Sequence, residues 1–408
     1  MTATRPSTRP APPTKSRPCS RNSRVKLKAR PEDFKVEERL RLRPGRRGRY
    51  AVYRLEKQLW NTLDVIRELE RRHRFRHIGR AGLKDRYSRS VQYLSTITAG
   101  PPAIREKNWR LEFVGRSDEP VSRDVLLGNR FTVTLRALQP EETEAVLEAW
   151  PVVCRSGFPN YYDEQRLGSA RHGQGFIARR LIAGHYNGAL KLWLATPSAN
   201  DDADARRRKR TILEHWGDWR ACLSHVPPEA RAAIGWLIAE PGDFEGAVRR
   251  IDRPLLELFL NAWQSWVWNE TLTLVLERSG LDLRRLEYNL GTFAFYRRVD
   301  AGQFRYLSRL VIPAPGPRAR FTSDRVEQAM TEVLARERLT LDAAKLPFRL
   351  RGLFFRTWDR PAVVVPKNPV LSRPGPDDLY PGRQRLTAGF FLPAGSYATV
   401  LVKALLPG

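Results

Sequence analysis

The sequence has few of the residues that metal sites and disulfides need. Its 408 residues include three cysteines, Cys19, Cys154 and Cys222, which lie far apart and form no CxxC pair. This spacing argues against a structural zinc site and against a disulfide framework. Because there are also only six histidines, we expect no metal. No run of about 18 apolar residues is present, so we expect no membrane span.

Nucleotide-binding glycine loops are missing as well. No P-loop and no dinucleotide-binding glycine loop follows a strand-like segment, so neither ATP nor NAD is expected as a cofactor. The first residues contain no apolar stretch of the kind that a secretory signal has. We therefore expect a cytoplasmic protein that works without a cofactor.

The sequence has an excess of positive charge. Lysine and arginine number 72 against 44 acidic residues, which gives a formal net charge of +28. Such a charge attracts polyanions, and nucleic acid is the partner we expect. A general bias toward arginine would raise the charge without any partner. An anionic membrane is a weaker alternative, because we find no basic amphipathic helix with a broad apolar face.

Composition and periodicity divide the chain into four segments. Residues 1–24 carry five prolines, six basic residues and no acid, which is typical of a disordered basic arm. Residues 25–155 alternate strand-like and helix-like stretches, 156–340 have mainly helical periodicity, and 341–408 return to strand-like alternation. A strand-rich end far from a strand-rich start indicates one α+β domain interrupted by a helical insertion.

Individual stretches make these expectations specific. FKVEERL and YAVYRLEK alternate like strands, and NTLDVIRELERRHRF has the period of a helix. In the last segment, PFRLRGLFFRTW and RLTAGFFLPAGSYATVLVKALL both alternate like strands. The basic run in DDADARRRKRTILEHW is favoured as a solvated helix face over an RNA-binding patch.

One short loop raises the question of chemistry. The stretch GLKDR places Asp85 between Lys84 and Arg86, and a turn of this kind is most often a solvated cluster of charges. Two other segments strengthen the loop as a candidate site. GNRF at 128–131 and GFPNYYDEQRLG at 157–168 supply aromatic faces, amide edges and a cation. These are the groups that recognise an unstacked base.

Seven segments in one order carry a family resemblance. They are DFKVEE (33–38), KQLWNT (57–62), AGLKDRYSRSVQ (81–92), GNRFTVTLR (128–136), GFPNYYDEQRLG (157–168), AWQSWVWN (262–269) and LPAGSYATVLVKALL (392–406). With them the chain, from about residue 25 to its end, resembles the TruD family of tRNA pseudouridine synthases. Residues 281–340 match the family poorly, and Leu167 stands where phenylalanine is common.

The resemblance implies a fold and a partner. The expected fold is α+β: a pseudouridine-synthase catalytic domain with a mostly antiparallel sheet, interrupted by an inserted helix-rich TRUD domain. The catalytic segments would be 25–155 and 341–408, the insertion 156–340, and the two domains would face each other across a basic RNA cleft. The expected substrate is tRNA, with other RNAs left open, and the expected protein is a monomer.

The resemblance also assigns roles to individual residues. Asp85 would be the catalytic carboxylate, Phe131 would stack on the target uracil, and Asn129 would fix the Asp85 loop. The further substrate-binding candidates are Lys84, Arg86, Glu38, Lys57, Gln165, Arg166 and Asn160. Simpler roles remain open for three of these residues, since Phe131 fits a strand core, Asn129 fits a strand cap and Lys57 fits a charge beside a helix.

The implied reaction is an isomerisation of uridine at position 13 of tRNA. It breaks the N1–C1′ bond, turns the base and joins it again through C5, which needs neither redox nor phosphate energy. An ionised carboxylate would act as nucleophile at C1′ or as base at C2′, and the sequence leaves both open. A basic neighbour would let that carboxylate stay charged in a dry pocket. The alternative is a catalytically inactive RNA-binding or RNA-chaperone protein that uses the same cleft.

The charge excess makes a prediction about binding. Affinity for tRNA should fall steeply as salt rises, because several cations displace counterions from phosphates. Deleting residues 1–24 should weaken binding modestly and leave turnover at saturating RNA unchanged. Filter binding across a salt series measures the affinities, and tritium release from tRNA labelled at C5 of uridine measures turnover. Binding that stays flat between low and moderate salt would contradict an interface of phosphate contacts.

Overall fold

The chain forms two compact units. The computed structural model describes residues 25–168, 170, 171, 174–198, 201–348, 350 and 352–407. We call residues 25–148 and Pro366–Gly395 the sheet unit, and Ala149–Val365 with Ser396–Leu406 the helical unit. The arm expected at residues 1–24 lies outside the described residues.

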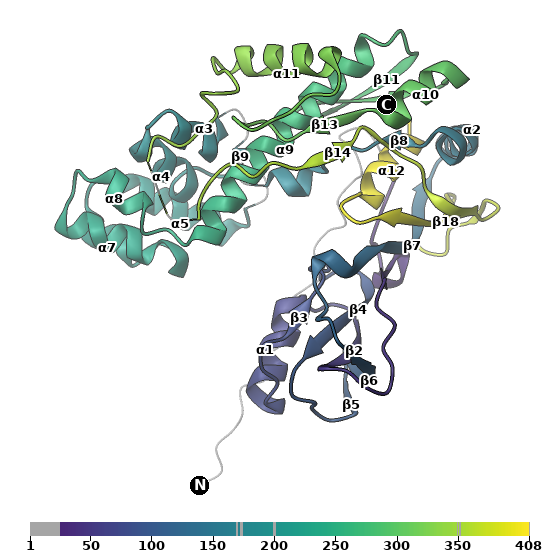
Figure 1. Ribbon diagram of the computed structural model, residues 1–408, viewed down its shortest axis with the longest axis horizontal. Helices are drawn as coiled ribbons and strands as arrows, with labels where there is room; N and C mark the ends of the chain where they lie inside the picture. Colours follow the sequence, from purple (N-terminus) through teal and green to yellow (C-terminus); the bar gives the residue numbers. More distant parts are fainter. Residues whose placement is uncertain are drawn as a thin grey trace. The chain divides into compact units, whose positions relative to one another are not determined.

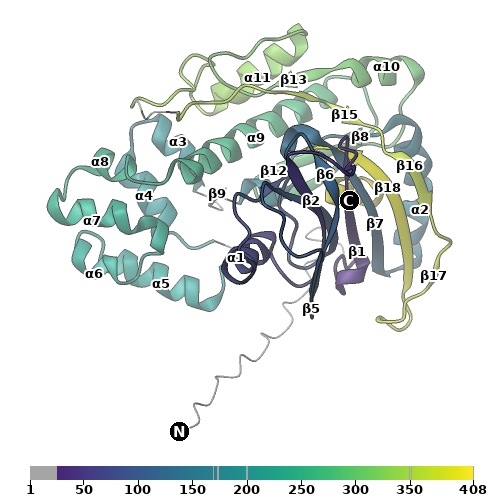
Figure 2. The same cartoon turned by 60° about the horizontal axis from the view of Figure 1, so that its bottom comes forward.

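The sheet unit is built on one mixed sheet. Its elements are η1 (Pro31–Asp33), β1 (Phe34–Leu40), β2 (Tyr50–Lys57), α1 (Thr62–His73), β3 (Gly79–Arg80), β4 (Arg89–Thr96), β5 (Ala103–Glu106), β6 (Trp109–Ser117), η2 (Arg123–Val125), β7 (Leu126–Leu138), β16 (Lys367–Leu371), β17 (Gly375–Pro376) and β18 (Gln384–Pro393). The strand order is β16-β18-β7-β1-β4-β2-β6-β5, with β17 paired to β18 and β3 to β4. Only the β1–β4 pair among these described strands is parallel, and Figure 2 shows β1, β7 and β18 side by side.

Helix α1 packs on the part of this sheet formed by β2 and β6. Its inward positions Val65, Ile66 and Leu69 join a buried cluster with Leu55 of β2 and Leu111 of β6. The 3.6-residue period of the helix places these three side chains on one face. The side chains of α1 therefore cover this part of the sheet with a buried apolar layer.

The helical unit is organised around one long helix. Its elements are β8 (Phe158–Pro159), η3 (Glu164–Leu167), β9 (Ala170–Arg171), β10 (Gly175–Phe176), α3 (Ile177–Ile182), α4 (Tyr186–Leu194), α5 (Ala203–Glu214), α6 (Trp219–Leu223), η4 (Pro228–Ala230), α7 (Arg231–Ala239), α8 (Phe244–Val248), α9 (Arg253–Glu277), β11 (Leu283–Tyr288), β12 (Gly291–Tyr296), α10 (Ala301–Arg309), β13 (Val311–Pro313), α11 (Asp324–Arg336), β14 (Asp359–Pro361), β15 (Val363–Val364) and α12 (Ala398–Leu405). Helix α2 (Pro140–Ser156) spans the boundary between the units. Helices α3 and α11 and strand β12 pack against α9. Figure 1 shows α9 as the long helix of this unit. Because other elements surround it, α9 is apolar on most of its circumference.

The expected fold class is confirmed. The protein is α+β, with a largely antiparallel mixed sheet and a helical insertion at about residues 177–277. The compact units and the segments expected from sequence have different bounds, so the division at 25–155, 156–340 and 341–408 stays a proposal. Within the described ranges, no helix has the length and hydrophobicity that crossing a bilayer requires.

Two strand expectations in the last segment are wrong. The described residues of 347–358 form turns and irregular chain, and the first strand after them is β14. Residues 398–405 form helix α12 instead of continuing the strand β18. Short apolar runs do not distinguish a buried strand from a buried helix. Here Gly395, at a φ of 88°, turns the chain between β18 and α12.

The sheet unit contains a network of ion pairs around the buried Arg136 side chain. Arg136 of β7 has a side chain only 4% exposed and donates to Asp33, Asp377 and Asp378, each at 2.8 Å. Burial favours a raised pKa for Asp377, but bonds from the Ala137 and Leu379 amides and from Arg136 hold it below its usual value. The Arg136 bond lowers the pKa of Asp378 to about 2.

This network predicts an acid-sensitive fold. Because the folded pKa values of Asp377 and Asp378 are depressed, their contribution is complete above the unfolded pKa of about 4. It is lost as pH falls through the lower folded values. Arg136→Ala would leave two buried carboxylates unpaired and lower the free energy of unfolding by about 3–5 kcal/mol. Urea unfolding at neutral pH measures this.

The matched control is Arg385→Ala, which removes an exposed guanidinium that also pairs with Asp378. An exposed pair contributes little, so this variant should unfold nearly as the unsubstituted protein does. Equal stability losses in the two variants would contradict a special role for the buried network.

Candidate active site

The Asp85 loop is fixed by a buried lysine. Residues 81–88 connect β3 to β4 in the sheet unit, so Asp85 lies on a loop between strands. Lys57, the last residue of β2, is 1% exposed, and its ammonium donates to the carbonyl oxygens of Trp60, Lys84 and Asp85 at 2.9, 3.2 and 3.0 Å. Burial lowers the pKa of Lys57 to about 8, against the field of the Asp85 carboxylate, which raises it. One ammonium thus satisfies two carbonyls of the Asp85 loop and that of Trp60, which lies between β2 and α1.

The Asp85 carboxylate has a cation beside it. The Lys28 ammonium lies 2.5 Å from Asp85 Oδ2, with the two side chains 23% and 38% exposed. The same ammonium lies 4.4 Å from the centre of the Phe34 ring. Lys28 has a left-handed backbone, with a φ of 60°, just before β1. The carboxylate is therefore paired with a positive charge and still reachable from solvent.

A second ion pair anchors the loop to β1. Lys84 donates to Glu38 Oε1 at 2.7 Å, and Glu38 is fully buried. The other Glu38 oxygen accepts the Tyr93 amide of β4 at 3.0 Å. The Lys84 amide in turn donates to Thr62 Oγ1 at the start of α1. Lys84, the residue before Asp85, is thus bound to β1 through Glu38, to α1 through Thr62 and to β2 through Lys57.

Strand register places Asn129 and Phe131 next to this loop anchor. Antiparallel pairing of β1 with β7 sets Glu38 opposite Asn129 and Val36 opposite Phe131. Opposed residues share a face of the sheet. The side-chain oxygen of Asn129 is buried and has no hydrogen-bond partner among the described residues. The bond expected from Asn129 to the Asp85 loop is therefore not made through that oxygen.

The Phe131 ring lies in an aromatic row. It is 7% exposed and contacts Phe34 edge-on at 6.0 Å and Phe390 of β18 at 5.6 Å between ring centres. Phe34 carries the Lys28 ammonium on its own face. The row links the sheet core to the Asp85–Lys28 pair, so Phe131 serves at least as core packing.

Of the remaining expected residues, Arg86 lies on the Asp85 loop and the others lie in the helical unit. Arg86 donates to the Leu59 carbonyl at 3.0 Å. Asn160, Gln165 and Arg166 belong to the helical unit. Asn160 is buried and binds Arg360 through its side-chain oxygen at 2.8 Å, whereas Gln165 is exposed. Their part in substrate binding stays a prediction.

Sequence reasoning missed Lys28. It lies 57 residues from Asp85, in a stretch outside the seven segments that carry the family resemblance. Its only local sign is that it stands shortly before DFKVEE, the first of these segments.

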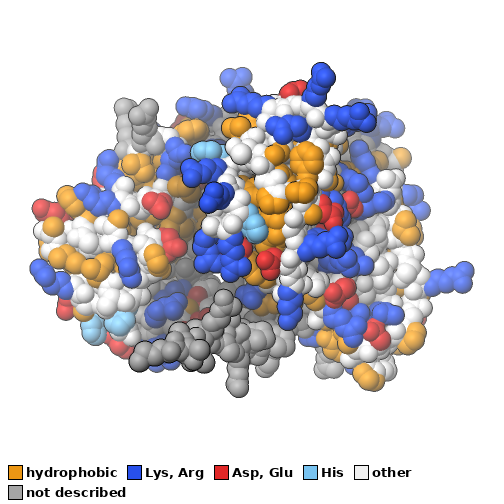
Figure 3. Space-filling view, turned by 90° about the horizontal axis from the view of Figure 1, so that it is seen from below, with side chains coloured by type: hydrophobic (Ala, Val, Ile, Leu, Met, Phe, Trp, Pro, Cys, Tyr) orange, Lys and Arg blue, Asp and Glu red, His pale blue; other side chains and the backbone are white. Residues whose placement is uncertain are grey.

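The geometry permits nucleophilic or acid–base chemistry by the side chains of the site. The site holds an accessible carboxylate, a paired ammonium and an aromatic wall, which suits attack on, or proton removal from, a sugar carbon. Among the described residues, no cluster of three or more His, Cys, Asp or Glu side chains could hold a metal ion. Lys and Arg side chains cover more of the face drawn in Figure 3 than Asp and Glu do, in keeping with a polyanionic substrate.

Known proteins share this sequence and fold. A family profile described as "tRNA pseudouridine synthase D (TruD)" matches residues 20–290. A "Probable tRNA pseudouridine synthase D 1" from Methanococcus maripaludis is 31% identical over 93% of this chain and 98% of its own. A "tRNA pseudouridine synthase D" from Aquifex aeolicus is 29% identical over the same shares. A crystal structure of a putative TruD from Methanosarcina mazei matches with a TM-score of 0.69 and 25% identity, over 96% of this chain and 95% of that one.

The lysine that fixes the Asp85 loop makes a prediction about local order. Lys57→Met keeps the length of the side chain but removes two hydrogen bonds to carbonyls of the Asp85 loop and one to Trp60, so the loop should open more often. We expect trypsin to cleave after Lys84 or Arg86 on the order of tenfold faster in the native protein. The control is Lys107→Met, which removes an exposed lysine of the same unit. Equal cleavage rates in both variants would show that the loop is held by other contacts.

Proposed function

This chain belongs to the TruD family of tRNA pseudouridine synthases, and we propose that it isomerises the uridine at position 13 of tRNA through the Asp85 carboxylate. The observation that carries the proposal is the Asp85–Lys28 pair at 2.5 Å, on a loop whose carbonyls Lys57 binds. A carboxylate that is paired, oriented and open to solvent is what a reaction at a sugar carbon needs. A negative charge in this position does not help to attract RNA, so it favours an enzyme over a protein that only binds RNA.

The reaction balances without a second substrate. The N1–C1′ bond of uridine breaks, and the base turns. C5 then bonds to C1′, the proton leaves C5, and N1 gains a proton. The product is an isomer, so no oxidant and no leaving group are required. As a nucleophile, Asp85 would form a bond to C1′ as N1 leaves, and this bond would break when C5 attacks C1′. As a base, it would take the C2′ proton as N1 leaves and return it to C2′ when C5 bonds to C1′.

The surrounding residues have separate tasks in this proposal. Lys28 stabilises the charged form of Asp85 where the base displaces water. Asn129, opposite Glu38 on β7, would help to fix the sheet beside the Asp85 loop. Phe131 and Phe34 form the apolar wall against which the ring lies. The flipped base would thus meet an aromatic surface beside the Asp85 carboxylate.

The helical unit has a supporting task. Arg360 binds Asn160 and so holds the segment before η3. In the proposal, Gln165 and Arg166 of η3 contact the RNA. We propose that the enzyme works as a monomer in the cytoplasm, where tRNA is available. Sedimentation of the protein with and without tRNA distinguishes a monomer from a dimer.

The central prediction concerns Asp85→Asn. The change keeps the size of the side chain but removes the negative charge, so isomerisation should become undetectable. The fold should survive, since a half-exposed loop residue contributes about 1 kcal/mol or less away from special sites. Binding of tRNA should persist or tighten. Tritium release from tRNA labelled at C5 of uridine measures turnover, and filter binding measures affinity.

Two controls sharpen this experiment. Asp118→Asn removes an exposed carboxylate of the same unit and should leave turnover unchanged. A labelled tRNA with cytidine at position 13 should release no tritium with the unsubstituted enzyme. Asp85→Asn turnover within about tenfold of the unsubstituted rate, a barrier change of about 1.4 kcal/mol, would remove Asp85 from the chemistry.

A further inference from the structure

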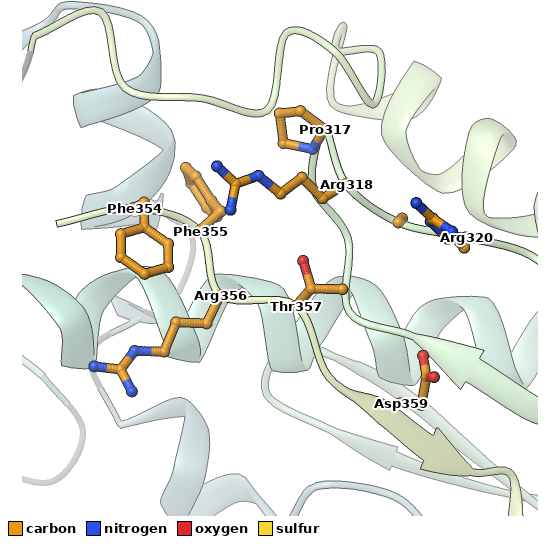
Figure 4. A pocket seen from close by; sticks show the side chains of 9 residues that line it. Pro317, Arg318, Arg320, Phe354, Phe355, Arg356, Thr357 and Asp359 are labelled. Carbon is orange, nitrogen blue, oxygen red and sulfur yellow. The ribbon is translucent and has the colours of Figure 1, made fainter. Parts of the chain in front are cut away.

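The helical unit contains a cavity that none of the proposed site residues lines. It has a volume of about 830 Å³ and is formed by residues 317–320, which follow β13, and 354–359, which lead into β14 (Figure 4). Antiparallel pairing of β13 with β14, with Ile312 opposite Arg360, brings these two segments together. The cavity is thus a product of the fold of this unit alone.

A buried glutamine of α9 fixes the two segments that line the cavity. Gln264 of α9 is fully buried, and its amide donates to the Pro315 carbonyl at 2.7 Å and to the Arg356 carbonyl at 3.0 Å. One side chain therefore ties both segments to the long helix. The ring of Phe355, which also lines the cavity, packs edge-on against the ring of Trp263, with 5.7 Å between the ring centres. The cavity is preformed, so filling it costs little ordering.

The lining combines cations with an exposed aromatic ring. Arg318, Arg320 and Arg356 line the cavity, and Asp359 is the acid among the lining residues. Arg356 is paired with Glu257, but neither Arg318 nor Arg320 forms an ion pair with a described carboxylate. Phe354 is 52% exposed, and the Arg318 guanidinium lies 6.0 Å from the centre of its ring.

These groups match one ligand chemistry. A phosphate accepts paired hydrogen bonds from a guanidinium, and an unpaired base stacks on an exposed aromatic ring. We propose that this cavity, the Arg318 pocket (residues 317–320 and 354–359), binds one unpaired nucleotide of the substrate RNA other than the isomerised uridine. Its phosphate lies on Arg318 and Arg320, and its base stacks on Phe354. The proposal rests on the proposed function, because that function supplies the RNA.

The arginines are tested by the double variant Arg318→Ala/Arg320→Ala. Its affinity for tRNA should fall about tenfold, and the slope of log affinity against log salt should shrink by about 0.7 for one phosphate contact to single-stranded RNA. The rate of tritium release at saturating tRNA should stay within about twofold, because the chemistry lies elsewhere. The matched control, Arg220→Ala/Arg231→Ala, removes two exposed arginines of α6 and α7, which lie away from β13 in the cartoon of Figure 2.

The aromatic ring is tested separately. Phe354→Ala should weaken tRNA binding about 5- to 10-fold through lost stacking and leave the salt slope unchanged, whereas Phe354→Trp should keep the affinity. Ultraviolet cross-linking of the unsubstituted protein to tRNA should give a nucleotide adduct on the tryptic peptide GLFFR, which contains Phe354.

The outcomes separate the two proposals. Pocket variants that bind tRNA as the control does, with no adduct on GLFFR, would overturn the pocket and leave it to an acidic protein partner, with uridine isomerisation unaffected. Pocket variants with a lowered rate at saturating tRNA would also overturn it as a binding subsite. An unsubstituted enzyme that releases no tritium from any tRNA would refute the proposed function, while the binding and cross-linking results still decide about the pocket.

Discussion

The Lys57 ammonium, buried at the end of β2, binds three carbonyl oxygens, and the orientation of the Asp85 loop depends on it. A buried cation is costly unless its donors are satisfied, and here each N–H has a carbonyl. The same burial lowers the pKa of Lys57 to about 8, which brings its charge close to the physiological range. The loop is therefore held by an interaction that pH can weaken.

The sheet supplies the rest of the site around this loop. Strands β1 and β7 bring Glu38, Asn129 and Phe131 to one face by register alone. Lys28 enters from the chain before β1 and places its charge between Asp85 and the ring of Phe34. The proposed chemistry uses each of these contacts. In that proposal Lys28 pairs with the reacting carboxylate. Lys57 binds the backbone of the Asp85 loop, and Glu38 binds the side chain of Lys84 beside it.

The sequence was sufficient for the local features and insufficient for the distant ones. Period and alternation predicted β1, β2 and α1, since each segment buries one face in the regular way. The motif around Asp85 predicted a loop between strands. Lys28 could not be found because its role depends on a contact 57 residues away. Helix α12 was mistaken for strand because a short, wholly buried apolar run has no period that distinguishes the two. The Arg318 pocket depends on the pairing of β13 with β14, which no local sequence pattern predicts.

The most direct test of this account is the single-turnover rate of tritium release from saturating tRNA, measured across pH for the unsubstituted enzyme and for Lys57→Met. The unsubstituted rate should fall as pH rises through about 8, because a neutral amine has two N–H groups for three carbonyls. Lys57→Met should be slower by about 100-fold, the cost of a misplaced reacting group, and should show no such fall. A folded Lys57→Met enzyme with the rate and pH profile of the unsubstituted protein would contradict the account.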